Sequence, residues 1–111
     1  MEWLIQPKVD ISFHYNGQID ISAKLAASLG LSSGDFINFG ANGHSVKKHP
    51  WGIAVRHGKL AKNNKPSYRR ANCVKVTRLF TSEEQPIARF RIGEIRNGIA
   101  EIITRINYAT D

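Results

Sequence analysis

Several features that would define a class of protein are scarce or missing in this sequence. The 111 residues include a single cysteine, Cys73, so an internal disulfide framework is excluded and a reducing compartment is favoured. No apolar run approaches the roughly 20 residues that a membrane-spanning helix requires. Residues 1–7 lack the basic-then-apolar order of a secretion signal. We therefore expect a cytoplasmic protein with no membrane partner.

Long polar tracts and linkers are missing as well. Hydrophobic residues make up 41% of the chain and charged residues 23%, which are values typical of a globular protein and exclude wholesale disorder. The length suits one folding unit, so residues 1–111 are predicted to form a single domain.

Acidic residues are absent from the middle of the chain. The chain holds 16 Lys and Arg against 9 Asp and Glu, a formal net charge of +7, yet residues 1–35 and 83–111 are each slightly acidic. Ten Lys and Arg lie in residues 40–82, which we call the basic block, and no acid lies in residues 36–82. Such side chains face water, an acid from elsewhere in the fold, or an anion.

The basic block favours a surface for a polyanion, most plausibly nucleic acid, because each neutralised phosphate releases counterions. Trp51 and Tyr68 lie among the cations and can stack on bases, but a tryptophan that opens a strand is more often a core or rim residue, and that interpretation of Trp51 is preferred. Two alternatives stay open: a face that docks an acidic protein partner, and a solvated face that only keeps the protein soluble. The predicted phosphate contacts are Lys47, Lys48, Arg56, Lys59, Lys62, Lys65, Arg69 and Arg70.

Apolar and polar residues alternate in the first third of the chain, which predicts strands. A hairpin turns at Asn16-Gly17, a dipeptide that tolerates positive φ. Ser22 is placed to cap a short helix, and Gly30 to end it. The expected elements are strands at 11–15, 18–21 and 36–39 and a helix at 23–29.

The remainder predicts a less regular order. A polar loop is expected at 40–50, a strand at 51–56 and a second loop at 62–66. Residues 71–80 fit either a strand or a helix, and the helix is narrowly preferred. The alternation at 87–92 and 98–106 predicts a C-terminal hairpin within 87–106. The fold class is therefore α+β and mostly β, with about six strands and two short helices.

Residues 15–39 also carry a recognisable pattern. Leu29-Gly30-Leu31 follows the short helix, and a Gly34-Asp35 turn leads into the next strand. The segment resembles the hairpin, helix and strand unit of AbrB-like and MazE-like swapped-hairpin proteins. The resemblance covers about 25 of the 111 residues. It implies an interleaved homodimer and, since many members are bacterial transcription regulators or antitoxins, a role in DNA binding.

Three positions depart from that family pattern. Gln18 stands where the family has Arg, Ser22 where it has Pro, and Ala26-Ala27 where basic residues are common. The unit that resembles a DNA-binding family is thus short of cations, whereas the basic block lies outside it.

No catalytic constellation is apparent. The sequence has neither a phosphate-cradling Gly-x-x-x-x-Gly-Lys nor a Gly-x-Ser-x-Gly motif. Cys73 with His57 is a pair that chance supplies, and His44, His49 and His57 lack a second cysteine or nearby acid to complete a metal shell. We expect a small bacterial protein that is not an enzyme, needs no cofactor or metal, and binds nucleic acid or an acidic partner.

Overall fold

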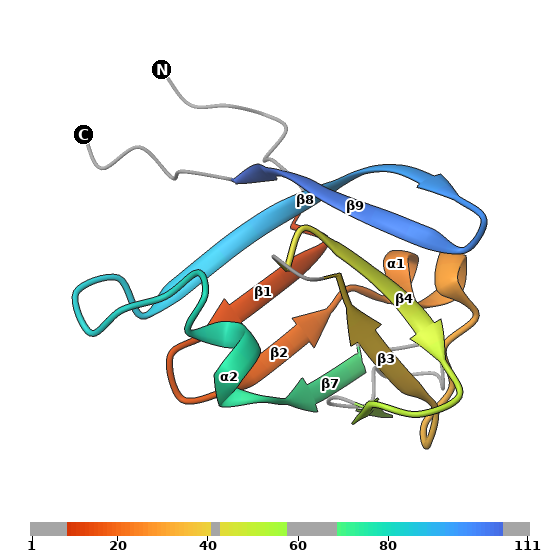
Figure 1. The fold of residues 1–111 in the computed structure, drawn as a ribbon, viewed down its shortest axis with the longest axis horizontal. Coiled ribbons are helices and arrows are strands. Elements are labelled where there is room, and N and C mark those ends of the chain that lie inside the picture. The colour runs from red at the N-terminus through yellow and green to blue at the C-terminus, as the bar shows by residue number, and fades with distance from the viewer. Residues whose placement is uncertain (1–8, 41–42, 58–68, 106–111) are drawn as a thin grey trace, which may run out of the picture.

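The N-terminal hairpin forms where the alternating pattern predicts it. The computed structural model describes residues 9–40, 43–57 and 69–105. Ile11 and Phe13 face inward, while Ser12 and His14, which alternate with them, face outward and are half-buried. The turn spans residues 15–17, and only Gly17 has a positive φ, of 103°. Figure 1 shows the whole fold. In chain order the described elements are β1 (Ile11–His14), β2 (Gln18–Ile21), α1 (Ala23–Leu29), β3 (Phe36–Phe39), β4 (Ser45–His49), β5 (Ile53–Ala54), β6 (Arg56–His57), β7 (Arg69–Asn72), α2 (Val74–Thr77), β8 (Ile87–Arg96) and β9 (Ile99–Arg105).

All the strands belong to one sheet that nearly closes on itself. Their order is β5-β3-β4-β9-β8-β1-β2-β7-β6, and every neighbouring pair with a described register is antiparallel. The two ends of that order, β5 and β6, are separated in the chain by Val55 alone. One run of chain therefore pairs with β3 through its first half and with β7 through its second, which brings the ends of the sheet together. Near-closure leaves few strand edges unpaired.

The prediction of a mostly β fold with two short helices is confirmed, but the number of strands is wrong. Counting β5 and β6 as one run, the described residues form eight strands in a barrel-like sheet, not about six. Part of the difference is β4, which lies where a polar loop was expected at 40–50. Only Val46 of this strand is fully buried, so hydrophobic alternation is weak. Backbone pairing with β3 on one side and β9 on the other makes it a strand.

Residues 71–80 contain both of the structures that their pattern allowed. The strand β7 runs to Asn72 because it pairs with β2, and the backbone N–H of Cys73 then donates to the carbonyl of Gly17. The helix α2 follows as a single turn. The preferred helix is thus correct for residues 74–77, and the strand for residues before them.

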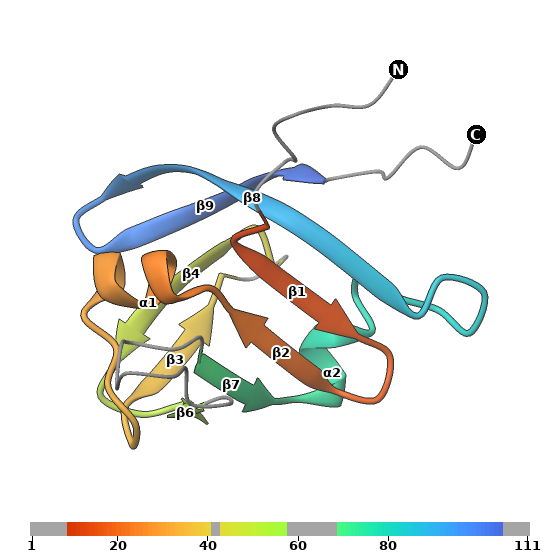
Figure 2. The ribbon, with the colours of Figure 1, turned by 180° about the vertical axis from the view of Figure 1, so that it is seen from behind.

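The barrel is filled by aliphatic side chains at one end and by phenylalanines at the other. Phe13 of β1 stacks on Phe80 with ring centroids 4.6 Å apart, and it also contacts Phe39 and Phe90 at 5.8 and 5.7 Å. The helix α1 covers the barrel with Leu25 and Leu29, and it lies on the opposite side of the molecule from α2 (Figures 1 and 2). The core therefore links strands from both halves of the chain.

The unit at 15–39 has the predicted hairpin, helix and strand. Ser22 accepts a hydrogen bond from the N–H of Leu25 at 3.1 Å, and Gly30 ends the helix with a φ of 67°. Each of its strands is paired on both sides within one chain: β2 with β1 and β7, and β3 with β4 and β5. The homodimer stays a prediction. In the described ranges, neither helix is long and apolar enough to cross a membrane.

Candidate nucleic-acid interface

Two outward surfaces of the barrel carry three described cations of the basic block, Lys47 on one and Arg56 and Arg70 on the other. The first lies over β3, β4 and β9. Lys47 and His49 alternate on the outer side of β4, and Lys47 lies opposite Asn38 of β3 and Ile99 of β9 in the register. Trp51 follows this strand after one residue, Pro50. We call this surface the β4 face; its members are Phe36, Asn38, Ser45, Lys47, His49, Trp51, Ile99 and the exposed acid Glu101, which lies opposite Ser45.

Trp51 is the most exposed large hydrophobic side chain among the described residues, with 64% of its surface accessible. Its ring meets the His49 ring edge to face, with centroids 4.5 Å apart and an interplanar angle of 82°. His49 Nδ1 lies 2.9 Å from the backbone carbonyl oxygen of Trp51 and 3.4 Å from its backbone nitrogen, so it donates to the carbonyl in one tautomer and accepts from the N–H in the other. The ring contact packs the indole against His49, the hydrogen bond joins His49 to the Trp51 backbone, and most of the indole stays open to solvent.

The backbone after Trp51 explains why the ring stays outside. Gly52 has a φ of 141°, and a Cβ there would overlap the backbone carbonyl of Ile37. Only glycine permits this close approach. The chain therefore passes tightly against β3 before Ile53 begins β5, and Trp51 is left at the rim.

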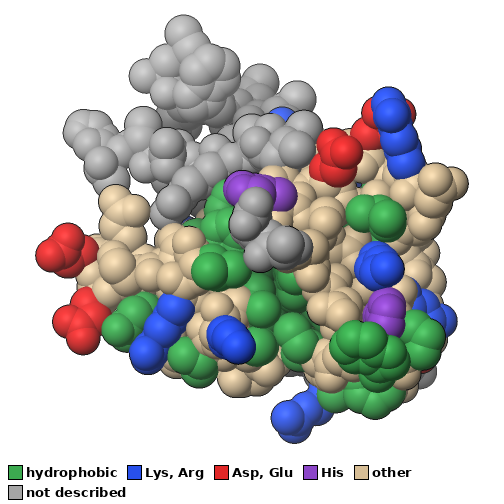
Figure 3. Space-filling view, in the orientation of Figure 1, with side chains coloured by type: hydrophobic (Ala, Val, Ile, Leu, Met, Phe, Trp, Pro, Cys, Tyr) green, Lys and Arg blue, Asp and Glu red, His purple; other side chains and the backbone are tan. Residues whose placement is uncertain are grey.

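Hollows flank His49 on both sides. One of about 400 Å³ is bordered by Phe36, His49 and Pro50, and one of about 280 Å³ by Lys47, His49 and Ile99. Figure 3 shows this side of the molecule, where hydrophobic, histidine and basic side chains lie next to one another over β3 and β4. An open, mixed surface of this kind suits an extended ligand better than a small enclosed one.

Lys48 turns away from its neighbour Lys47. Its Nζ lies 3.3 Å from an Asp35 carboxylate oxygen and donates to the carbonyl of Gly30 at 3.3 Å. The pKa of Asp35 is lowered, first because its carboxylate accepts a hydrogen bond from the backbone N–H of Ser32 and also because of Lys48. Lys48 is thus tied to the end of α1, and Lys47 is the open cation of the pair.

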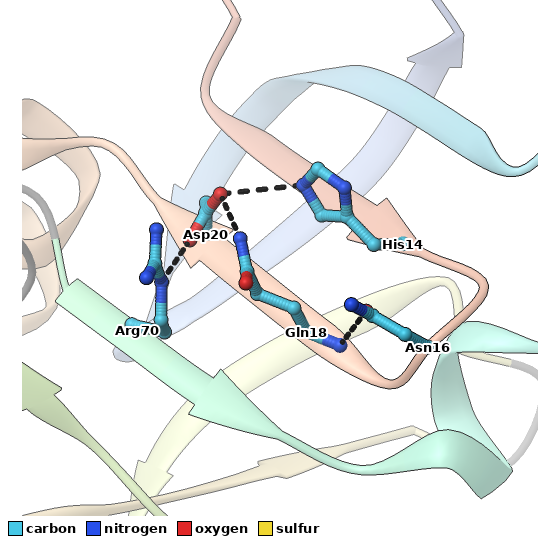
Figure 4. Close-up of polar contacts among 5 residues, drawn as sticks. All are labelled: His14, Asn16, Gln18, Asp20 and Arg70. Atoms are coloured by element: carbon cyan, nitrogen blue, oxygen red, sulfur yellow. Dashed lines mark hydrogen bonds and ion pairs between the residues drawn. The ribbon is translucent and has the colours of Figure 1, made fainter.

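The second surface lies over β1, β2, β7 and β6, toward the viewer in Figure 2. At its centre the carboxylate of Asp20 accepts hydrogen bonds from Arg70 Nε at 2.9 Å and from Gln18 Nε2 at 3.0 Å. His14 Nε2 lies 3.3 Å from the same carboxylate (Figure 4). We call this surface the β7 face; its members are His14, Gln18, Asp20, Arg56, Arg70 and Asn72.

Arg56 belongs to the same face. It lies directly opposite Arg70 in the β6–β7 register, so both side chains project to the same side of the sheet. A hollow of about 240 Å³ is lined by these two arginines together with Gln18, Ala71 and Asn72. No described carboxylate forms an ion pair with Arg56.

The eight residues predicted to contact phosphate therefore do not lie on one surface. Lys47 lies on the β4 face, Arg56 and Arg70 lie on the β7 face, and Lys48 is tied to Asp35 between them. Arg69 is buried, with 9% of its surface accessible, because alternation along β7 turns it inward with Ala71. Lys59, Lys62 and Lys65 lie outside the described residues, as does Tyr68.

Other candidates from the sequence can also be placed. Cys73 is a half-buried free thiol that packs against the core at the start of α2. Within the described ranges, no group of three or more His, Cys, Asp and Glu side chains lies close enough to hold a metal ion. Glu83 and Glu84 are exposed in the turn before Pro86.

Sequence analysis missed the network around Asp20. His14, Gln18 and Asp20 carry the right signal, since they are the outward residues of an alternating hairpin, but Arg70 is 50 residues away and its strand was not predicted as such. Comparison with family models, with curated proteins and with solved structures finds no match to this chain. Any functional assignment therefore rests on the residues themselves.

Proposed function

We propose that this protein binds nucleic acid without sequence specificity, preferring single strands, through the β4 face. The observation that carries the proposal is the exposed ring of Trp51, packed edge to face against His49, which alternates with Lys47 on the outer side of β4. The proposal concerns binding alone and includes no catalytic step.

Stacking supplies the first part of the interaction. An exposed aromatic ring held in place can accept any base, because every base has a π-face, and each such stack contributes about 1–3 kcal/mol. Trp51 meets this requirement, because its ring packs edge to face against the His49 ring and most of the indole stays accessible. Phe36 and Ile99, also part-exposed, border the two hollows that flank His49.

Charge supplies the second part. Lys47 is exposed and lies opposite the amide of Asn38, which offers a further hydrogen-bonding group to a backbone or a base. A lysine acts on phosphate as a point charge and carries no base information. The combination supports non-specific binding.

The test uses Trp51 as its own reporter. A Trp3→Phe background leaves Trp51 as the remaining tryptophan of the chain. Titration with a twelve-nucleotide oligothymidylate should quench its fluorescence saturably. The logarithm of the association constant should fall linearly with the logarithm of salt concentration, with a slope of about −0.7 for each phosphate contacted.

Matched variants separate stacking from charge. Trp51→Leu keeps an apolar side chain but removes the ring, and we expect it to weaken binding about 5- to 150-fold, measured by anisotropy of a labelled strand. Trp51→Phe should retain most of the affinity. Lys47→Ala should reduce the salt slope by about 0.7, whereas Lys24→Ala, an exposed lysine on α1, should leave it unchanged.

Two results would count against the proposal. Absence of saturable quenching by single-stranded DNA and RNA at low salt would exclude a nucleic-acid surface here. Equal binding of polyglutamate, with the same loss in Lys47→Ala, would favour the alternative function, a module that docks an acidic protein partner.

The resemblance of residues 15–39 to AbrB-like proteins adds a homodimer to the proposal. Because each strand of that unit is already paired within one chain, a dimer needs no exchange of strands. Sedimentation should then show a species of twice the 12.4 kDa chain mass at micromolar concentration. A species of the chain mass alone would rule the homodimer out.

A further inference from the structure

We propose that the hollow between Arg56 and Arg70 on the β7 face is a separate site for a phosphate-type oxyanion. It requires no stacking at Trp51 and lies on another side of the barrel from the β4 face. The inference starts from the register, which sets the two arginines directly opposite each other on β6 and β7.

Two like charges in directly opposed positions of an antiparallel pair repel each other and destabilise the sheet. The arrangement here is a row across three strands, in which Asp20 of β2 lies opposite Arg70 and Arg70 lies opposite Arg56. Among the described residues, one carboxylate thus stands against two guanidinium groups, which leaves an excess of one positive charge in this row. A bound oxyanion would neutralise it.

Asp20 also gives Arg70 a defined orientation. Its Oδ1 accepts from Arg70 Nε at 2.9 Å, and its Oδ2 accepts from Gln18 Nε2 at 3.0 Å (Figure 4). This contact orders the Arg70 guanidinium beside the hollow, and the planar fork of an arginine matches phosphate oxygens. Asp20 therefore acts as a positioning residue for this site.

The remaining lining completes a polar cradle. Gln18 and Asn72 form the next cross-strand pair along β2 and β7, and both border the same hollow of about 240 Å³ as the arginines. The exposed side-chain amide of Asn72 adds a hydrogen-bond donor. Two guanidinium groups and an amide donor around one hollow select for an anion with several oxygens.

The chemistry fits either a free phosphate ion or the terminal phosphate of a nucleotide strand. The first experiment uses inorganic phosphate, titrated at constant ionic strength against chloride, and follows the Nε–H resonances of the arginines by NMR. Saturable shifts are expected for Arg56 and Arg70, and none for Arg96, which pairs with Glu94 at 2.7 Å elsewhere. Arg56→Gln should weaken binding about tenfold or more, and Arg56→Lys should recover only part of it.

The second experiment distinguishes the two sources. In the Trp51→Leu variant, a 5′-phosphorylated hexathymidylate is compared with its 5′-hydroxyl form. Preference for the phosphorylated strand, lost in Arg56→Gln, would assign the site to strand ends; equal affinity alongside phosphate binding would assign it to the free ion.

The inference is overturned if the Arg56 and Arg70 resonances shift no more than that of Arg96 at saturating phosphate. This outcome leaves the quenching of Trp51 by oligothymidylate intact, so the two proposals can fail separately. Circular dichroism of each variant controls for misfolding.

Discussion

The two outward faces of the barrel use their polar side chains in different ways. On the β7 face, Asp20 engages His14, Gln18 and Arg70 at 2.9–3.3 Å, so three strands are tied together by one carboxylate. On the β4 face, Trp51 and Lys47 are exposed, and the contact between His49 Nδ1 and Trp51 at 2.9 Å involves the backbone carbonyl of Trp51. The first face therefore contributes to stability as well as to any binding, whereas the second is available for binding alone.

The comparison shows how one block of positive charge can have more than one role. Lys48 and Arg70 are neighbours in sequence of Lys47 and Arg69, yet Lys48 and Arg70 pair with acids from residues 1–35, and Arg69 is buried. The acidic N-terminal flank thus supplies the partners that the basic block lacks within itself. Net charge alone does not indicate which cations stay open for a ligand.

The largest expected effect is one that removes both faces together. Phe13 packs against Phe39 of β3 and Phe90 of β8 and so links the strands under the β4 face to those under the β7 face. Replacing Phe13 with Ala leaves a cavity, and we expect a loss of about 3–5 kcal/mol in the free energy of unfolding. Urea denaturation gives this value.

Phe13→Leu is the matched control and should lose less, because it removes fewer buried atoms. Loss of oligothymidylate binding in Phe13→Ala, with phosphate binding at Arg56 unchanged under the same conditions, would contradict a shared core.

The second prediction compares how much each face contributes to the free energy of unfolding. Asp20→Ala leaves donors on Gln18 and Arg70 without their acceptor, and we expect a loss of about 1–2 kcal/mol, since charged hydrogen bonds on a part-exposed surface contribute this much. Trp51→Leu should change stability by less than about 0.5 kcal/mol. Thermal unfolding of the two variants side by side measures the difference.

Asp20→Asn serves as the control, because it keeps an acceptor and should show an intermediate loss. If Trp51→Leu unfolds at as low a temperature as Asp20→Ala, the β4 face also holds the fold together, and the distinction between the two faces disappears.

How far the sequence predicts this arrangement depends on the range of the interactions involved. The hairpin of β1 and β2, the cap at Ser22 and the glycine end of α1 at Gly30 were all predicted, because each depends on residues close in the chain. The turn between β8 and β9 was predicted for the same reason, since Asn97-Gly98 adopts positive φ at both positions.

The rest depends on contacts that no local pattern encodes. Pairing with β3 and β9 makes a strand of β4, although its hydrophobic alternation is weak. Pairing of β7 with β2 buries Arg69 and exposes Arg70, so the predicted phosphate contacts divide only once the register is known. The candidate residues were identified by type, but their grouping into two faces required the barrel.

The smallest effect tests why Lys48 differs from Lys47. Asp35→Asn can still accept the hydrogen bond from Ser32 but loses its charge toward Lys48. Because the pKa of Asp35 in the folded protein lies below its ordinary value of 3.8, the carboxylate adds stability that is complete above that value and disappears as the pH falls through the lower, folded pKa. The wild-type protein should therefore unfold at a slightly higher temperature than Asp35→Asn at neutral pH, and the gap should close in strong acid. Glu84→Gln, at an exposed glutamate in the turn before Pro86, is the matched control for this comparison.

The same Asp35→Asn change frees the Lys48 cation beside the β4 face. The affinity of the variant for oligothymidylate at low salt should therefore rise. A fall would mean that Asp35 supports the β4 face rather than restraining Lys48.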